Sequence, residues 1–507
     1  MNNFKQKLTA YLKGRDFPAT VLTAIIIAAV VFVNIIIYTL STVFPLYLYS
    51  PTQDDFSISS SSEALFEKYI ELGERVTVTF CSYEDQVNSH DTGKFVLETA
   101  KEFASKYPEF ITLRFVNAIT KLDSEGKSAA ADLEAYGKDG ENNINDTSVV
   151  FSTETNFRVL TDKVTGVGYA DFYTLNNNKQ ITSYNGEEIF VSSILWTLSE
   201  NHGVAYMTVG HGETADYTLY NILTAAGYEV KDINLRKNDI PEDAELVIIS
   251  KPTSDFERGA EGSSLITEYD RLRAYQKRGG NFFITLSPLT KKLPVLESFV
   301  GDFGVSFYTV ESGEKALIKD SQNGITTDGF TLVAEYADTD YAQAMKQIIG
   351  DRTGDTDASV IIRNVAALTL DSAKKAYPIL SSSASSVCRA GGDTVDDAGN
   401  YTIAACAIAD NDLSDSAKLF VMSEGMMTTG DAVVSDGYSN KDFLYSIFDV
   451  FYEKGDMPYG CNSVVYDTQI LENLTMGSAK IYTALILTVP AVIAVVGAIL
   501  IRRRKNR

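Results

Sequence analysis

Two long runs of uncharged, mostly apolar residues near the ends of the chain constrain its fold more than any other feature. One run extends over 22 residues from Ala19 to Leu40, and the other over 21 residues from Ile481 to Ile501. At a rise of about 1.5 Å per helical residue, either run can cross roughly 30 Å of hydrocarbon. We therefore expect transmembrane helices at 19–40 and 481–501, with short tails at 1–18 and 502–507.

The charges beside these runs predict their orientation. The two tails together hold nine Lys and Arg residues and one Asp. Because basic flanks are retained on the cytoplasmic side, both termini should lie in the cytoplasm and the bulk of the chain outside the plasma membrane. The tails have a net charge of +8, and the whole chain has a net charge of −23. The part between the tails therefore has a net charge of −31. That charge disfavours non-specific binding to nucleic acid.

Each apolar run has an alternative interpretation. The first could be the core of a cleavable signal peptide, but such cores span about 7 to 15 residues and precede a small-x-small cleavage site. This run is longer, and Ser41–Pro45 offers no such site. The second could be a buried helix of a soluble core, but five basic residues follow it within the last six positions of the chain. We expect two uncleaved anchors in contact with the lipid bilayer.

The region after the first anchor begins with a polar stalk at 41–62 and continues into an α/β domain at 63–199. Helical spacing and strand-like alternation there predict helices at 63–72, 94–107 and 187–198, and strands at 75–80, 111–116, 148–151 and 157–160. This β-α-β start followed by later strands resembles a thioredoxin-like layout. Cys81 ends the first strand without a cysteine two or three residues away, which disfavours redox chemistry.

A second α/β domain is expected at 203–455, followed by a juxtamembrane linker at 456–480. Its first part alternates strands at 204–209, 229–235, 245–250 and 281–286 with helices at 217–226 and 265–277. That alternation predicts a doubly wound, mainly parallel sheet. Further strands are expected at 401–408 and 417–423, and a last helix at 441–452.

One short motif in this domain is a candidate site. Gly210, His211, Gly212 and Glu213 follow a predicted strand directly. In open α/β sheets, ligands bind beyond the carboxyl ends of the strands. The motif is therefore a candidate ligand-binding or vestigial catalytic site. The alternative is a tight turn in which the glycines adopt positive φ while the His and Glu side chains bond to nearby backbone.

Other sequence patterns predict no enzyme. Gly-x-Ser-x-Gly, the Walker A pattern and the dinucleotide fingerprint Gly-x-Gly-x-x-Gly are all missing from the sequence. The three histidines are scattered, and the four cysteines form no C-x-x-C pair. We therefore expect no catalytic residue, no metal site and no cofactor. Cys388 and Cys406 could form a disulfide, or all four cysteines could be free and buried.

Several segments resemble the gliding-motility-type auxiliary subunits of ABC transporters. The segments are Val209–Glu213, Leu223–Gly227, Ile240–Ala244, Arg278–Asn281 and Gly186–Glu187 entering the helix to Leu198. The resemblance covers most of the chain and is specific between about Ser183 and Asp302. It implies a domain related to the class-I glutamine-amidotransferase fold without that fold's catalytic cysteine. It also implies assembly with a separate ABC ATPase and a multi-span permease.

Three functions remain in competition at this point. The first is a non-enzymatic auxiliary subunit of an ABC-type transport system. The second is an extracytoplasmic module that binds a ligand or the cell envelope without a transporter. The third is a surface hydrolase or amidotransferase that uses His211 and Glu213. Recovery of an ATPase and a permease with the protein would favour the first.

Overall fold

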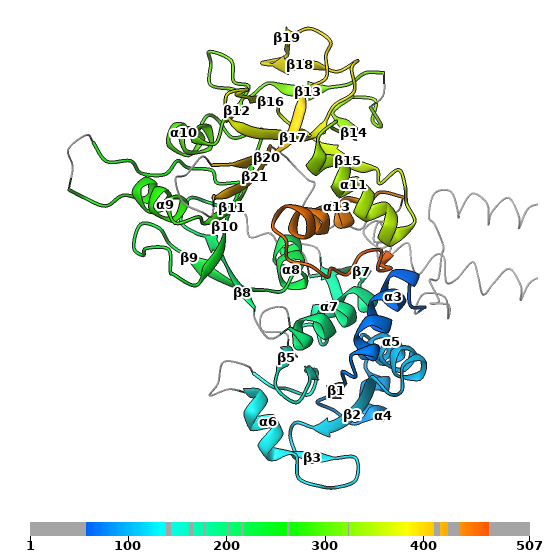
Figure 1. Cartoon of the computed structure of the whole chain (residues 1–507). Helices are drawn as coiled ribbons and strands as arrows, with labels where there is room; N and C mark the ends of the chain where they lie inside the picture. Colours follow the sequence, from blue (N-terminus) through cyan, green and yellow to red (C-terminus); the bar gives the residue numbers. More distant parts are fainter. Residues whose placement is uncertain are drawn as a thin grey trace, which may run out of the picture. The chain divides into compact units, whose positions relative to one another are not determined.

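The computed structural model describes residues 57–137, 143–161, 166–175, 179–199, 202–213, 217–260, 264–322, 324–409, 416–423 and 437–465. The two expected anchors, both tails and most of the stalk lie outside these residues. No helix within them is long and apolar enough to cross a bilayer. They form a mixed α/β fold, with all described residues in one compact unit (Figure 1).

The first part of this unit, which we call the N-terminal lobe, comprises residues 57–199. Its elements are α3 (Ser60–Glu71), β1 (Val76–Phe80), α4 (Glu84–Ser89), α5 (Gly93–Lys106), β2 (Ile111–Asn117), β3 (Leu122–Asp123), α6 (Ala130–Gly137), β4 (Val149–Ser152), β5 (Phe157–Leu160), η3 (Ala170–Phe172), β6 (Tyr173–Leu175), β7 (Ile181–Tyr184) and α7 (Gly186–Leu198). The main sheet has the order β3-β2-β1-β4-β5. β1 is parallel to β2 and antiparallel to β4. The expected β-α-β start and the later strands are therefore confirmed, and the structure adds that β4 and β5 are antiparallel to their neighbours.

Helix α7 lies deep in the N-terminal lobe. Apart from Trp196 and Leu198, all of its residues are buried, including two consecutive glutamates at its first turn. Phe190 stacks on Phe103 of α5, with ring centroids 5.4 Å apart, and meets Phe151 of β4 edge-on at 5.1 Å. These aromatic contacts bury large apolar areas and fix the helix against the sheet.

The second part, the C-terminal lobe, comprises residues 202–465. Its elements are β8 (Gly203–Thr208), α8 (Tyr217–Ala225), β9 (Tyr228–Ile233), β10 (Ala244–Ser250), α9 (Glu268–Lys277), β11 (Asn281–Leu286), α10 (Pro294–Asp302), β12 (Val305–Phe307), β13 (Leu317–Lys319), β14 (Thr331–Tyr336), α11 (Asp340–Thr353), β15 (Val360–Arg363), β16 (Leu368–Leu370), β17 (Lys375–Ser381), β18 (Val387–Ala390), β19 (Asp393–Asp396), β20 (Thr402–Ile408), β21 (Lys418–Ser423), α13 (Asn440–Ser446), the π-helical turn η4 (Ile447–Phe451) and β22 (Val464–Val465).

The central sheet of this lobe has a parallel half and an antiparallel half. Strands β9-β8-β10-β11-β21 are parallel to their neighbours. Beyond β21 the sheet continues through β20, β17, β14 and β15, which are all antiparallel. The expected parallel sheet is confirmed for the first half. Strand order reverses between β8 and β10, and in other open α/β sheets ligands bind beyond the carboxyl ends of the strands at such a position.

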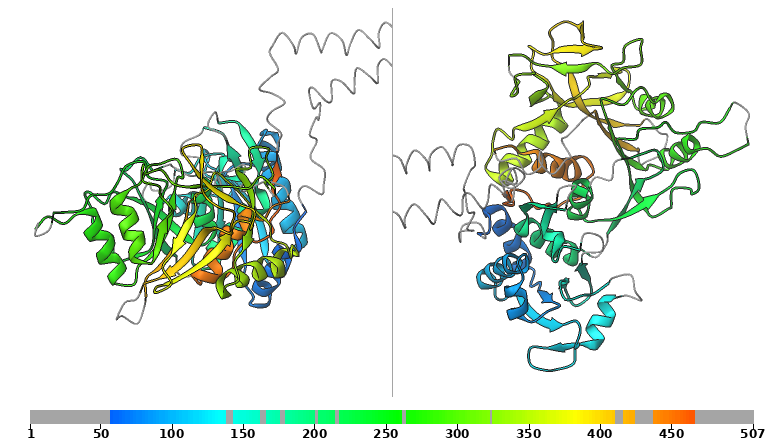
Figure 2. Two further views of the ribbon diagram at one scale, coloured as in Figure 1. Left: turned by 90° about the horizontal axis from the view of Figure 1, so that it is seen from above. Right: turned by 180° about the vertical axis from the view of Figure 1, so that it is seen from behind.

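Helices cover both faces of the parallel half. Leu246 and Ile248 of β10 pack in one core with α8, α11 and α13, whereas Val247 and Ile249 pack in another with α9 and α10. Figure 1 shows α9 and α10 on the opposite side of the sheet from α11 and α13, and the view from behind in Figure 2 agrees. Because both faces are covered, the strand sequence is continuously apolar rather than alternating.

Three element boundaries differ from the expectation by three residues or more. Helix α3 begins at Ser60 instead of 63, inside the expected stalk, because the Ser59 side chain caps it by accepting the Ser62 N–H. Helix α9 begins at Glu268 instead of 265, since Thr267 caps it and the Asp270 carboxylate accepts the Thr267 N–H at 2.9 Å. Leu265 and Ile266, which open the expected helix, lie outside α9 and are 77% and 65% exposed. The last helix, expected at 441–452, is α-helical only to residue 446 and continues as the π-helical turn.

Candidate functional sites

The Gly210–Glu213 motif forms a tight turn at the carboxyl end of β8. Gly210 and Gly212 have φ values of +118° and +70°. A Cβ atom at Gly212 would overlap Thr253 Oγ1, which belongs to the turn after β10. Residues with side chains are disfavoured in both conformations, so glycine suits this close approach of two turns. The glycines therefore have the roles that the tight-turn alternative gives them.

His211 lies inside this turn with 1% of its surface exposed. Its Nδ1 is 3.3 Å from Glu213 Oε1, and its Nε2 is 3.0 Å from Glu268 Oε2 at the start of α9. The imidazole also stacks on Phe256, with ring centroids 4.1 Å apart. Glu213 folds back to accept the His211 backbone N–H at 2.6 Å. Both ring nitrogens thus face carboxylates, an arrangement that suits a protonated imidazole donating from both.

The pKa values of this group shift in the directions that such an ion cluster requires. Burial by itself lowers the pKa of His211, but the hydrogen bond to Glu213 and the charge of Glu268 outweigh it and raise the pKa above its ordinary value. Burial likewise opposes the change in Glu213, whose pKa is lowered by its hydrogen bond to His211. Glu268 has a further cation nearby, since Arg236 Nε lies 3.6 Å from Glu268 Oε1.

The His211 backbone carbonyl joins the turn after β8 to the turn after β10. It accepts the N–H groups of Thr253 and Ser254 at 2.8 and 2.9 Å. His211 is buried, and its ring and backbone carbonyl are all hydrogen-bonded. These bonds connect the end of β8 to the turn after β10 and to α9. Ligand binding by Gly210, His211, Gly212 and Glu213 stays a prediction. Within the described residues, no group of three or more His, Cys, Asp or Glu residues could hold a metal ion.

All four cysteines are buried and free. Cys388 lies in β18 and Cys406 in β20, which belong to different sheets. Burial raises the pKa of the Cys81 thiol to about 12. Little thiolate is therefore present at neutral pH, and the thiolate is the reactive form.

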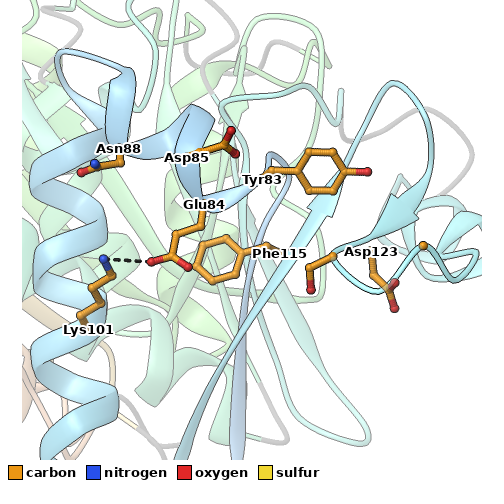
Figure 3. Close-up of a pocket in the computed structure, with 9 residues that line it drawn as sticks. Tyr83, Glu84, Asp85, Asn88, Lys101, Phe115 and Asp123 are labelled. Atoms are coloured by element: carbon orange, nitrogen blue, oxygen red, sulfur yellow. Dashed lines mark ion pairs between the residues drawn. The ribbon is translucent and has the colours of Figure 1, made fainter.

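A hollow of about 720 Å³ opens in the N-terminal lobe at the carboxyl ends of β1 and β2. It is lined by Tyr83, Glu84, Asp85, Asn88, Lys101, Phe115, Asp123, Ser124 and Gly126. Figure 3 shows the rings of Tyr83 and Phe115 beside it and Lys101 Nζ reaching Glu84 Oε1, at 3.0 Å. Sequence reasoning missed this hollow, because its residues come from four separate segments.

A third cluster surrounds the two glutamates at the start of α7. Glu187 accepts the Ser59 N–H and the Ser62 hydroxyl at 2.7 Å each through Oε1, and the Asn462 N–H at 2.8 Å through Oε2. Glu187 therefore binds one segment near the first described residue and another near the last. Gly186–Glu187 was one of the segments in the family resemblance, but its contacts could not be read from the sequence.

Glu188 continues this cluster into the C-terminal lobe. Its Oε2 lies 3.1 Å from Lys441 Nζ of α13, and its Oε1 accepts the Tyr445 hydroxyl. Lys441 also donates to the Cys461 carbonyl at 3.1 Å and to Ser463 Oγ at 3.3 Å. We call Glu187, Glu188, Lys441 and Tyr445, with the segments they bind, the junction cluster.

The last described residues reinforce the junction cluster. Strand β22 pairs antiparallel with β7 of the N-terminal lobe, with Val464 opposite Tyr184. The Asp442 carboxylate accepts the Gly460 N–H at 2.8 Å. Residues 456–465, expected in the juxtamembrane linker, thus pack against both the N-terminal lobe and the rest of the C-terminal lobe.

No protein-family model matches this chain, and no curated protein matches it. Among solved structures, it is similar to the mmIFT52 N-terminal domain, with 14% identity over 50% of this chain and 98% of that one, at a TM-score of 0.36. A putative ThuA-like protein from Bacteroides uniformis has 14% identity over 51% and 96%, at 0.31. A glutamine amidotransferase from Thermotoga maritima has 12% identity over 51% and 88%, at 0.24. Similarities this low support no inference about function.

Proposed function

We propose that the protein is a non-enzymatic auxiliary subunit of an ABC-type transport system, anchored in the plasma membrane by helices at 19–40 and 481–501. Its N-terminal lobe is a thioredoxin-like domain and its C-terminal lobe a glutamine-amidotransferase-like domain without a catalytic nucleophile. Both lobes lie outside the cytoplasm and couple to a permease and an ATPase. The observation that supports this most is the junction cluster.

A subunit that couples to a permease needs a firm link between its membrane anchors and its outer domains. Glu187 binds Ser59, on the side of the first expected anchor, and Asn462, on the side of the second. Glu188 and Lys441 then bind the two lobes to each other. The Glu188–Lys441 pair is buried, and the Glu187 bonds to Ser59 and Asn462 are part-buried. Because all of these contacts are charge-assisted, they hold a defined geometry. A displacement of either anchor would therefore reach α7 and, through it, both lobes.

The hydrogen-bonded turn at His211 is consistent with a role other than catalysis. A general base must reach a substrate proton within about 2.6 to 3.2 Å. His211 is 1% exposed, and its ring nitrogens are directed at Glu213 and Glu268. A hydrolase using this residue would have to break both contacts before it could act.

The test is recovery of the complex from membranes. The chain carries an affinity tag after residue 507 and is extracted in mild detergent from cells that express it at native level. We expect an ABC ATPase and a multi-span permease to co-purify in fixed proportion. Their consistent absence, with the tagged chain still folded and membrane-bound, would refute the proposal. Display of the tag on the cell exterior would refute the topology on which it rests.

A further inference from the structure

Arg158 of β5 is a cation without a partner at the junction of the two lobes. It is opposite Phe151 in the β4–β5 register, and residues opposite each other point to the same face of a sheet. Phe151 meets Phe190 of α7, so Arg158 lies on the face that α7 covers. Helix α7 in turn packs against α8 of the C-terminal lobe (Figure 1). The guanidinium therefore lies where elements of both lobes meet.

This guanidinium has no acceptor within the part of the chain that the structure describes. Its Nη1 is buried without a hydrogen-bond partner, and no carboxylate there lies within ion-pair distance. Burial lowers the pKa of Arg158 to about 10, and the nearby charge of Asp171 offsets this only in part. The group is thus still charged at neutral pH. Buried arginines are almost always paired, because an unpaired charge is costly to remove from water. A buried guanidinium nitrogen without an acceptor therefore indicates an anionic ligand.

A second donor without an acceptor lies near Arg158. Burial lowers the pKa of His202, and the charge of Arg158 lowers it further, so the imidazole is neutral at neutral pH. Asn156 Oδ1 accepts the Phe157 N–H at 3.0 Å, which fixes the orientation of the amide. Its Nδ2 therefore donates to the Ser199 carbonyl at 3.0 Å and to His202 Nε2 at 3.1 Å. Because Nε2 is an acceptor, the proton is on Nδ1, which is buried without a hydrogen-bond partner.

We propose that the Arg158 guanidinium binds a small oxyanion, a carboxylate or a phosphate, where β5, α7 and α8 meet. Arginine suits this ligand because its planar guanidinium can donate two parallel N–H groups to two oxygens. The side chain is part-exposed, so the anion reaches it from solvent. The bound anion contacts elements of both lobes and so strengthens their association. The site does not depend on the transporter role.

Trp196 gives a direct measure of this binding, because its ring stacks on that of His202 with centroids 3.7 Å apart and planes 2° apart. A protonated imidazole in such contact quenches indole emission, so the emission measured against pH follows the pKa of His202. An oxyanion that neutralises the Arg158 charge should raise this pKa by roughly 0.5 to 1. The groups that act on it are Arg158, Glu229, Lys454 and the Gly227 carbonyl, which attracts the Nδ1 proton from outside hydrogen-bond geometry.

The experiment titrates the full chain in a neutral detergent with sodium phosphate or sodium acetate, at an ionic strength held constant with sodium chloride. We expect a saturable rise in the pKa of His202 with at least one of the two anions, and the anion that saturates at the lower concentration identifies the chemistry of the ligand. Arg158→Gln should itself raise the pKa of His202 and should abolish the response to both anions. Lys454→Met is the matched control, since it also removes a cation that lowers this pKa but should keep the response.

The proposal fails on any of three results. The first is no saturable response of the wild-type chain to either anion at millimolar concentration. The second is an equal response in Arg158→Gln, which would mean general screening of an acidic chain. The third is a response that appears only in Asp171→Asn, which would mean that Asp171 pairs with Arg158 in solution. Hydrogen exchange protection across α7 checks that each variant remains folded.

Discussion

Replacing Lys441 by methionine should lower the free energy of unfolding by about 3 to 5 kcal/mol. The lysine and its partner Glu188 are each only 9% exposed at the side chain, and their charged atoms are 3.1 Å apart. Without Lys441 Nζ, the Glu188 carboxylate stays buried with a negative charge, and the Cys461 carbonyl loses a donor. Removing one member of a buried ion pair typically destabilises a protein by this amount, because the remaining charge is left without compensation.

The double variant Glu188→Gln/Lys441→Met separates charge from packing. Glutamine keeps an oxygen that can accept the Tyr445 hydroxyl, and no buried charge remains. We expect the double variant to lose less free energy of unfolding than the two single variants lose together, by at least about 1.5 kcal/mol. Coupling of this size is usual for residues in contact. Lys454→Met serves as the matched control: Lys454 pairs with Glu245 at 2.8 Å, but Glu245 is 53% exposed, so its loss should be below about 1 kcal/mol.

The assay is urea unfolding of the full chain in detergent, followed by tryptophan fluorescence. Trp196 is the only tryptophan and lies in α7, the helix that carries Glu188. Its signal therefore reports the transition in which the junction cluster is lost. Hydrogen exchange at Asn462 gives a local measure, because its N–H donates to Glu187. If Lys441→Met behaved like Lys454→Met, or if the losses were additive, the cluster would not be the ionic link described here.

Two further predictions concern the other buried groups. The raised pKa of His211 stabilises the fold below about pH 6.5, and that stability is lost as pH rises through the folded pKa. The lowered pKa of Glu213 stabilises the fold above about pH 4.5, and that stability is lost as pH falls through the folded pKa. The protection factor of the 209–213 amides, which is the exchange rate corrected for its intrinsic pH dependence, should therefore be highest between these values, and His211→Gln should remove its alkaline decrease. The four buried thiols should resist maleimide in the native protein and all react after denaturation without reductant, and labelling of only two would reveal a disulfide.

The sequence predicted the parallel half of the central sheet because its signals are local. Strands such as β10 and β11 are runs of six or seven residues, mostly apolar, and Gly227 and Gly279 follow the helices that connect the strands. The antiparallel half was largely missed. The missed strands of this half include β14 and β17, of six and seven residues. Others are very short: β12 and β16 contain three residues each and pair across a long stretch of the chain, and β13, β18 and β19, which form a separate sheet, contain three or four. Segments this short carry too few positions to show a period.

In the candidate sites, too, the sequence predicted local features but not contacts between distant residues. Gly210 and Gly212 were identified from one short motif, since positive φ is a local requirement. The partners of His211 and Glu188 could not be identified in this way. Glu268 is 57 residues from His211, and Lys441 is 253 residues from Glu188. Leu265 and Ile266 fitted a helical period, but the Thr267–Asp270 cap starts α9 after them.

The chemistry of the junction cluster indicates that it contributes a fixed geometry in addition to stability. A buried ion pair is often no more stabilising than apolar residues of the same volume, because both charges must leave water. Apolar contacts, however, are non-directional and tolerate small slides. The Glu187 carboxylate accepts three donors from two ends of the described unit, and Glu188 accepts two from α13. Such bonds weaken steeply with misalignment, so the cluster fixes one register of the Ser59–Ser62 segment and of Asn462 against α7. Because these segments are held in one register, a movement of either can be transmitted to α7. Apolar contacts that slide would absorb such a movement.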